Sequence, residues 1–228
     1  MISVYAAVPS YTGAILCQTA QCLMDEFADA TRRGWRFNTV FHVGNSMITR
    51  ARNSLVAHFL STSATDLVFV DADLAWDRGA LCRLIATPEA FVCGLYPKRT
   101  EPLEWPLILR EDRNMTLDPL TGLLEIAAAP GGFMRLKRAV LEQMIAAYPE
   151  LIYDEPFAPG GVAHGLFDFA RNGRAYISED YVFCQRYRKI GGKVWADPNI
   201  TFEHIGQKGM RGRFADYLTK QSLAQPGP

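Results

Sequence analysis

Apolar and polar positions follow two different periods along the first hundred residues of the chain. Short apolar runs end in Gly, Pro or small polar residues, which is typical of buried strands. Between these runs, apolar residues recur every three or four positions, which indicates amphipathic helices. The expected strands are residues 2–8, 35–43, 66–70 and 91–97, and the expected helices are residues 14–33 and 46–60, the second with Ser46 as its N-cap. This alternation predicts an α/β fold whose sheet is mostly parallel and flanked by helices.

The pattern changes in the second half of the chain. Residues 97–122 are rich in Pro, Trp and charge and show no period, so we expect a loop excursion, and long ordered loops often serve as lids or binding loops. Residues 153–175 are also expected to form a loop. The remaining expected strands are residues 123–129, 193–198 and 200–206, and the remaining expected helices are residues 136–148 and 178–190.

Length and charge narrow the classes of function. We expect one domain over residues 1–220 and a flexible C-terminal tail over residues 221–228, since 228 residues suffice for a single large core. Lys plus Arg and Asp plus Glu both number 24, so no net charge draws the chain toward nucleic acid or an anionic membrane. A local basic segment remains at Lys208, Arg211 and Arg213.

Compartment and redox state are predicted from patterns that the chain lacks. No window approaches the ~18 uninterrupted apolar residues of a membrane span, and no signal peptide pattern opens the chain, so we expect a cytoplasmic protein without a membrane span. An odd number of cysteines without a C-x-x-C pair is a poor disulfide framework. We therefore expect reduced core thiols at Cys17, Cys22, Cys82, Cys93 and Cys184.

The first candidate for chemistry is the pair Asp71 and Asp73, which directly follows the apolar strand at residues 66–70. Ligands of open parallel sheets bind outside the carboxyl ends of the strands, and residues two apart in extended chain point to the same side. Two neighbouring carboxylates repel each other unless a cation lies between them, and their hard oxygens suit Mg²⁺ or Mn²⁺. The alternative is that Asp71 caps a turn and Asp73 is solvated.

Arg52 is a second candidate because it lies inside the apolar stripe of the helix at residues 46–60. Arg50 points away from this stripe, and we expect it to face solvent. An arginine on a buried face requires an anionic partner, which could be a protein carboxylate such as Asp71 or Asp73, or a ligand phosphate. The two roles are compatible.

Further candidates come from the last third of the chain. Glu179 and Asp180 open a helix, where acidic residues are common for purely structural reasons, but one carboxylate there could also be a general base. His204 follows the last expected strand and could be a third metal ligand or a structural residue. Gly131 and Gly132 allow either a tight turn or close approach of a substrate.

Taken in order, these segments resemble a glycosyltransferase of the GT-A fold, close to the family 2 type and to small phage and bacterial enzymes of that group. The segments that carry the resemblance are VPSYTG, TRARN, DAD, GGFMRLKRAVLEQM and SEDYVFCQRYRKIGGKVWADPNITFEHIG, of which the last is the most specific. The resemblance covers most of the chain. It implies an enzyme that moves a sugar from a nucleotide-diphosphate sugar to an acceptor hydroxyl, with Mn²⁺ or Mg²⁺ as cofactor.

The resemblance also implies residue roles. Asp71 and Asp73 would hold the divalent ion against the donor diphosphate with His204 as a further ligand, Asp180 would be the base of an inverting reaction, and Glu179 would orient acceptor or sugar. Pro9, Tyr11, Arg52 and Ala72 would contact the nucleotide sugar, and Gly132, Phe133 and Trp76 would shape the acceptor or sugar pocket. A UDP-sugar is the expected donor, and the acceptor is a glycan, a protein or a modified nucleic-acid base.

One departure from the family concerns the nucleotide. Family 2 enzymes usually have an acidic residue after a later strand that recognises the nucleoside, and FHVGNS has none. Two alternatives to a transferase remain open. The first is a sugar-nucleotide-binding module of the same fold without turnover, and the second is a sugar-nucleotide pyrophosphorylase, whose Gly-rich basic nucleotide loop is missing from AVPSYTGAIL.

Overall fold

The computed structural model describes residues 1–112, 115–206 and 209–224. A seven-stranded sheet runs through the centre in the order β2-β1-β3-β7-β5-β12-β6. Its strands are β1 (Ser3–Ser10), β2 (Arg36–Val43), β3 (Asp66–Val70), β5 (Phe91–Gly94), β6 (Leu124–Ile126), β7 (Phe133–Lys137) and β12 (Val194–Asp197). β1, β2, β3, β5 and β12 share one direction, and β7 and β6 run against their neighbours. The expected single-domain α/β fold with a mixed, mostly parallel sheet is therefore confirmed.

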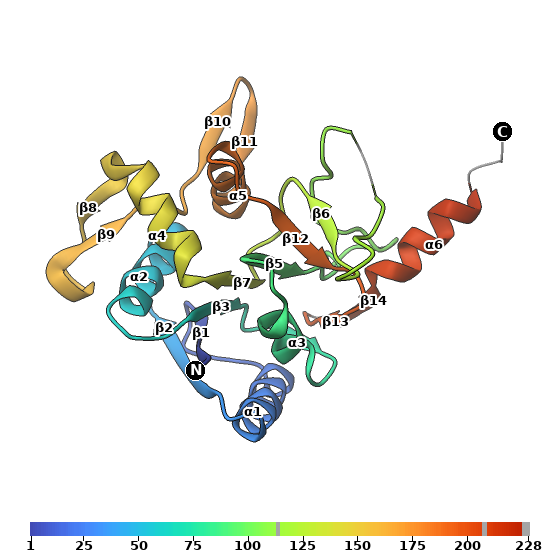
Figure 1. The fold of residues 1–228 in the computed structure, drawn as a ribbon, viewed down its shortest axis with the longest axis horizontal. Helices are drawn as coiled ribbons and strands as arrows, with labels where there is room; N and C mark the ends of the chain where they lie inside the picture. The colour runs from blue at the N-terminus through green and yellow to red at the C-terminus, as the bar shows by residue number, and fades with distance from the viewer. Residues whose placement is uncertain (113–114, 207–208, 225–228) are drawn as a thin grey trace.

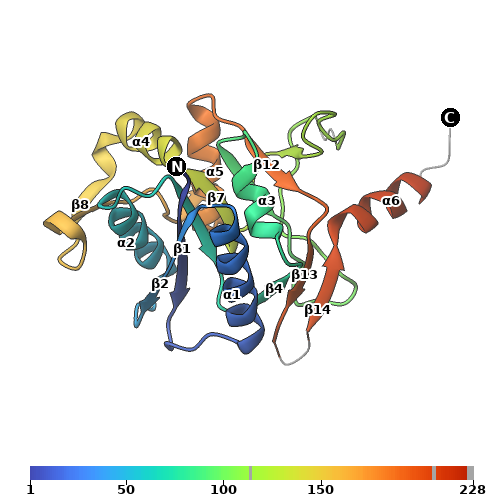
Figure 2. The ribbon, with the colours of Figure 1, turned by 60° about the horizontal axis from the view of Figure 1, so that its bottom comes forward.

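Helices cover both faces of this sheet (Figures 1 and 2). α1 (Cys17–Arg32) and α3 (Ala80–Ala86) pack on one face, and α2 (Ile48–Leu60), α4 (Arg138–Ala147) and α5 (Glu179–Lys189) pack on the other. Two-sided cover explains why all five residues of β3 are buried, as the continuous apolar run predicts.

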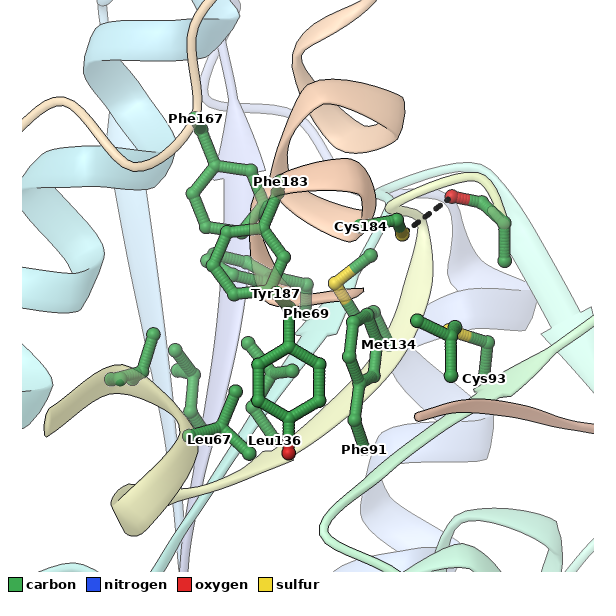
Figure 3. Close-up of a cluster of buried hydrophobic side chains, with 14 of the residues drawn as sticks. Leu67, Phe69, Phe91, Cys93, Met134, Leu136, Phe167, Phe183, Cys184 and Tyr187 are labelled. Atoms are coloured by element: carbon green, nitrogen blue, oxygen red, sulfur yellow. Dashed lines mark hydrogen bonds between the residues drawn. The ribbon is translucent and has the colours of Figure 1, made fainter. Parts of the chain in front are cut away.

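The α5 face of the core is built from interlocked aromatic rings (Figure 3). Phe167 and Phe183 stack with ring centroids 4.3 Å apart, and Phe69 of β3 meets Phe167 edge-on at 5.3 Å. Phe91 of β5 contacts Phe183 at 5.7 Å. Because Phe183 belongs to α5, these rings fix the helix over β3 and thereby place its N-terminus, Glu179 and Asp180, near the end of that strand.

Smaller elements extend from the sheet. The connections contain 3₁₀ turns at η1 (Pro149–Leu151) and η2 (Pro159–Gly161), and α6 (Phe214–Ala224) ends the described chain. β4 (Leu74–Trp76), β13 (Thr201–His204) and β14 (Met210–Arg213) form a three-stranded sheet beside the large one (Figure 2). Among the described residues, no helix is both long and apolar enough to cross a bilayer.

Several local expectations differ from the structure. Residues 133–137 form β7 in the centre of the sheet, a strand that we did not expect and that includes the first two residues of the helix expected at 136–148. The expected loop at 153–175 contains two hairpins, one formed by β8 (Ile152–Asp154) and β9 (Val162–His164), the other by β10 (Ala170–Asn172) and β11 (Ala175–Ile177). Residues 97–122 carry only isolated bridges in their described part, as expected of a loop excursion.

Three further predictions, for the N-cap of α2, the cysteines and the C-terminal tail, also differ from the structure. The N-cap of α2 is Met47 rather than Ser46, and no side-chain hydrogen bond caps this end of the helix among the described residues. All five thiols are free, but Cys17 is exposed and Cys22 is only half-buried, whereas the other three are buried in the core as expected. Of the expected tail, residues 221–224 continue α6, while residues 225–228 and the basic Lys208 lie outside the described residues.

Candidate functional site

The site lies where β3 ends and β7 begins. These antiparallel neighbours pair Val70 with Phe133, so the residues just beyond them, Asp71 and Gly132, are brought together. The backbone N–H of Asp71 donates a hydrogen bond to the Gly132 carbonyl at 2.8 Å. The acidic pair and the glycine turn, far apart in sequence, thus form one corner of the molecule.

Gly131 and Gly132 are required by close packing at this corner. A Cβ added at Gly132 would lie 2.3 Å from Oδ2 of Asp71 and 2.5 Å from the hydroxyl of Tyr96, and one at Gly131 would lie 2.9 Å from Cζ of Arg52. Real Cβ atoms do not approach other atoms so closely. The glycines therefore let the backbone press against three polar side chains.

Arg52 is the buried centre of the site, with only 3% of its surface exposed. It donates hydrogen bonds to Asp71 at 3.2 Å, to Glu179 at 3.3 Å and to the carbonyl of Gly131 at 3.0 Å. Burial opposes its charge, yet Asp71, Glu179 and Asp180 together hold the Arg52 pKa above its usual value. The expected carboxylate partner of Arg52 is confirmed as Asp71.

The carboxylates at the N-terminus of α5 face the same corner. Glu179 is buried against Arg52, and burial raises its pKa against the opposing effect of the guanidinium. Asp180 is more accessible, and it accepts hydrogen bonds from the N–H of Gly131 at 3.0 Å and of Tyr181 at 2.8 Å. The Ser178 hydroxyl contacts the Asp180 carboxylate instead of capping the helix backbone. The acidic pair that could have been a plain helix cap is thus joined to Arg52 and the glycine turn.

Asp73 and His204 form the outer half of the site. Nε2 of His204 lies 3.7 Å from Oδ1 of Asp73. Nδ1 of His204 lies 2.9 Å from the Pro97 carbonyl. A carbonyl oxygen only accepts, so Nδ1 carries a proton, and Nε2 is the ring nitrogen nearer Asp73. Arg99 also contacts the Asp73 carboxylate.

The donor set can be compared with what a divalent ion needs. Among the described residues, no group of three or more His, Cys, Asp or Glu side chains is arranged to hold a metal ion. Asp73 and His204 nevertheless place one carboxylate and one imidazole nitrogen 3.7 Å apart, and Asp71 lies one residue before the turn. Mg²⁺ and Mn²⁺ commonly take one or two protein ligands and complete their shell with water and phosphate, so these residues fit such an ion.

The other expected site residues are dispersed. Pro9 is near the end of β1, beside β3 in the sheet, and Tyr11 follows it with 64% of its surface exposed. The Ala72 carbonyl accepts hydrogen bonds from the loop and helix after β1, at Leu16 N and Thr19 Oγ1. The loop between the two aspartates is therefore anchored to the segment that follows β1.

Phe133 and Trp76 lie in the core instead of lining a pocket. Phe133 is fully buried, and its ring centroid lies 4.9 Å from that of Trp76, which is 7% exposed. The indole N–H of Trp76 donates to Glu26 at 3.2 Å. Both rings support the site from behind rather than offer a surface to a ligand.

Sequence reasoning missed Tyr96 and Arg99. The buried hydroxyl of Tyr96 accepts a hydrogen bond from the N–H of Gly132 at 3.1 Å, and its ring stands edge-on to that of His204 at 5.2 Å. Burial and the nearby Asp71 carboxylate raise the Tyr96 pKa well above its usual value. The one available signal was position, since Tyr96 lies near the end of the expected strand at residues 91–97 and Arg99 lies two residues beyond it.

Comparison with known proteins adds little to this geometry. No family model matches the chain, and no curated protein matches it. One solved structure with a partial match is a glycosyltransferase involved in the glycosylation of the major capsid of PBCV-1, with a TM-score of 0.32 and 8% sequence identity. The match covers 64% of this chain and 66% of that chain, slightly under two thirds of its length. A similarity of this size carries no argument about activity.

Proposed function

We propose that the protein is a metal-dependent glycosyltransferase that moves a sugar from a nucleotide-diphosphate sugar to an acceptor hydroxyl. The observation that carries the proposal is the buried network in which Arg52 joins Asp71, Glu179 and Gly131. It unites residues from α2, the end of β3, the glycine turn and α5 at the carboxyl edge of the sheet, where open α/β sheets bind ligands. A plain helix cap or a solvated turn does not require this convergence.

Asp71 and Asp73 have different roles in this proposal because Asp71 is bonded to the buried Arg52 and Asp73 is more accessible. Asp73 and His204 would hold Mn²⁺ or Mg²⁺ with Asp71 beside them, and the ion would supply positive charge against the donor diphosphate. Asp71 itself is committed to Arg52. The ion pair between Arg52 and Asp71 keeps the end of β3 in place, while Asp73, the other carboxylate of the acidic pair, would face the ligand.

Asp180 is the better placed of the two α5 carboxylates to act as the base of an inverting reaction. Glu179 is 7% exposed, is bonded to Arg52 and has a raised pKa, whereas Asp180 is less buried and is oriented by two backbone N–H groups. A positioned base typically contributes about 10²–10⁴ in rate. In this proposal, Asp180 removes the acceptor proton and Glu179 orients the reacting groups.

The donor is proposed to be a UDP-sugar. The exposed Tyr11 ring and Pro9 at the end of β1 offer an apolar surface for the base. The acceptor, a glycan, protein or modified nucleic-acid base, approaches from the 97–122 segment and the 153–175 segment. The alternative is a module that binds the sugar nucleotide without turnover.

Replacement of Asp73 tests the proposal. In Asp73→Ala, transfer with Mn²⁺ should fall at least about 100-fold, because the diphosphate loses its charge partner, while the melting temperature stays close to that of the wild type. Asp25→Ala on α1, whose carboxylate accepts a hydrogen bond from the Gln21 side chain one turn earlier, is the control. Release of nucleoside diphosphate with and without acceptor is measured.

Two outcomes contradict the proposal. Full activity of Asp73→Ala in the presence of a chelator would exclude metal-dependent transfer at this site. Tight binding of sugar nucleotides without diphosphate release, across glycan, protein and nucleic-acid acceptors, would favour the binding module.

A further inference from the structure

Arg99 contacts Asp73, one of the two side chains that are proposed to hold the divalent ion. Its guanidinium contacts the Asp73 carboxylate, and its stem lies against Gly206, where an added Cβ would be 3.0 Å from Cδ of Arg99. Two residues earlier, the Pro97 carbonyl accepts the hydrogen bond from His204. The start of the 97–122 segment is therefore fastened over the outer half of the site.

The two guanidinium groups of the site differ in how firmly they are held. The side chain of Arg52 is 4% exposed and has several partners, whereas that of Arg99 is 43% exposed and that of Asp73 is 35% exposed. Exposed ion pairs contribute little to stability, while breaking a buried pair is costly. Arg52 is thus a fixed part of the corner, and Arg99 can exchange partners.

We propose that Arg99 is a catalytic residue that binds the terminal phosphate of the donor diphosphate once a divalent ion has replaced it at Asp73. This inference rests on the proposed function. In the ligand-free protein the guanidinium neutralises Asp73, so the site carries less excess negative charge before the ion arrives. A planar guanidinium then suits a phosphate because it can donate two parallel hydrogen bonds.

The chemistry gives Arg99 a defined task. During transfer, the bond between the anomeric carbon and the terminal phosphate oxygen breaks, and its electron pair stays on that oxygen. The acceptor oxygen forms the new bond to the anomeric carbon, and its proton passes to the Asp180 carboxylate. Negative charge therefore grows on the phosphate oxygen that Arg99 contacts, and its stabilisation is an electrostatic effect on the transition state.

Arg99→Ala tests this role, with Lys98→Ala as a matched control. Lys98 is the neighbouring cation of the same segment, and its Nζ pairs with Glu104 at 3.0 Å, away from Asp73. Mn²⁺ affinity is measured by electron paramagnetic resonance, and the affinities for UDP, GDP and CDP and for the matching monophosphates are measured by calorimetry with Mn²⁺ present. The turnover number with the preferred donor is measured in parallel.

Arg99→Ala should leave Mn²⁺ affinity unchanged or tighten it up to about five-fold, since a competing cation is removed. Diphosphate affinity should fall about ten-fold or more with no change for the monophosphate, and the turnover number should fall about 10²–10³-fold. Arg99→Lys should recover part of this loss. Lys98→Ala should resemble the wild type in its affinities for Mn²⁺ and for the nucleotides.

Three results would overturn the inference in distinguishable ways. Weaker Mn²⁺ binding in Arg99→Ala would show that Arg99 helps to form the metal site, whereas the proposal requires the ion to displace Arg99 from Asp73. Equal losses for monophosphate and diphosphate would exclude contact with the terminal phosphate. If the wild type binds neither Mn²⁺ nor any of the three diphosphates, the proposed function itself fails and this inference falls with it.

Discussion

Gly132 shows how a single missing side chain positions several present ones. With no Cβ, its backbone lies against both the Asp71 carboxylate and the Tyr96 hydroxyl. Its carbonyl accepts a hydrogen bond from the N–H of Asp71, and its own N–H donates one to the Tyr96 hydroxyl. Polar groups confined in this way have few alternative orientations. The turn therefore acts as the rigid back wall of the site.

Gly132→Ala should damage activity more than stability. The added methyl group must displace Asp71 or Tyr96, at a cost of about 1–3 kcal/mol in the free energy of unfolding, and it shifts a carboxylate of the site. We expect transfer to fall at least about ten-fold with a folded, cooperative melting curve. Gly165→Ala is the control, because its nearest atom is an ordinary 3.6 Å away. Wild-type transfer rates in Gly132→Ala would contradict this account.

Residue patterns predicted the inner half of the site better than the outer half. Arg52 stood out because a charge interrupted an apolar stripe, and Asp71 because it ended an apolar strand, so burial alone required them to find partners. Arg99 makes a half-exposed contact from an aperiodic segment rich in proline and charge. A contact of that kind leaves no periodic signal in the sequence.

At the scale of elements, β7 was the main error, and the reason lies in Arg135. A strand in the middle of a sheet with a fully buried arginine resembles one turn of an amphipathic helix, and α4 follows at once. Arg135 is tolerated because its guanidinium pairs with Asp66 at 2.9 Å and donates to the Ile85 carbonyl at 2.9 Å. Only the folded sheet shows those partners.

The hairpin of β8 and β9 is tied to α2 by a second ion pair. Arg50, expected to face solvent, donates to both oxygens of Glu155 at 2.6 and 2.9 Å. The Glu155 side chain is 1% exposed, although that of Arg50 is 41% exposed. The hydrogen bonds from Arg50 lower the Glu155 pKa against the effect of burial.

The contribution of Glu155 to the free energy of unfolding should therefore decrease at acid pH. A carboxyl group with a lowered pKa in the folded state stabilises the protein above its unfolded pKa of about 4.5, and this contribution is lost as the pH falls through the folded value. We expect Glu155→Gln to cost about 1–2 kcal/mol at pH 7, or about 2–8 °C in Tm, and to cost less at pH 3. Melting curves from pH 3 to 7 measure this, and a constant difference between the two proteins across that range would exclude the ion pair as its cause.

For the molecule as a whole, the two-sided α/β sheet was predictable because its strands and helices have clear and different periods. The site lies at one edge of that rigid layer and is covered by segments with little regular structure. Ligand binding should therefore stabilise the native state without rebuilding the fold.

A thermal-shift screen of UDP-, GDP- and CMP-sugars checks this expectation. At a ligand concentration about 100 times Kd, the native state gains about 2.7 kcal/mol, which corresponds to about 5–10 °C in Tm for a chain of this size. The shift should require Mn²⁺ and should disappear in Asp73→Ala. An equal shift in a chelating buffer would show that nucleotide sugars bind without the ion.

The pairing of β3 with β7 also has a consequence for synthesis on the ribosome. Between them the chain must produce β4, α3, β5, the 97–122 segment and β6. A nascent chain that has just passed Asp73 therefore carries its acidic pair on a strand with one edge still open, and open edges invite wrong partners. Gly131 and Gly132, which pack behind Asp71, are synthesised much later, and α5 is synthesised later still. The corner that holds the candidate site can close only after most of the protein has left the ribosomal tunnel.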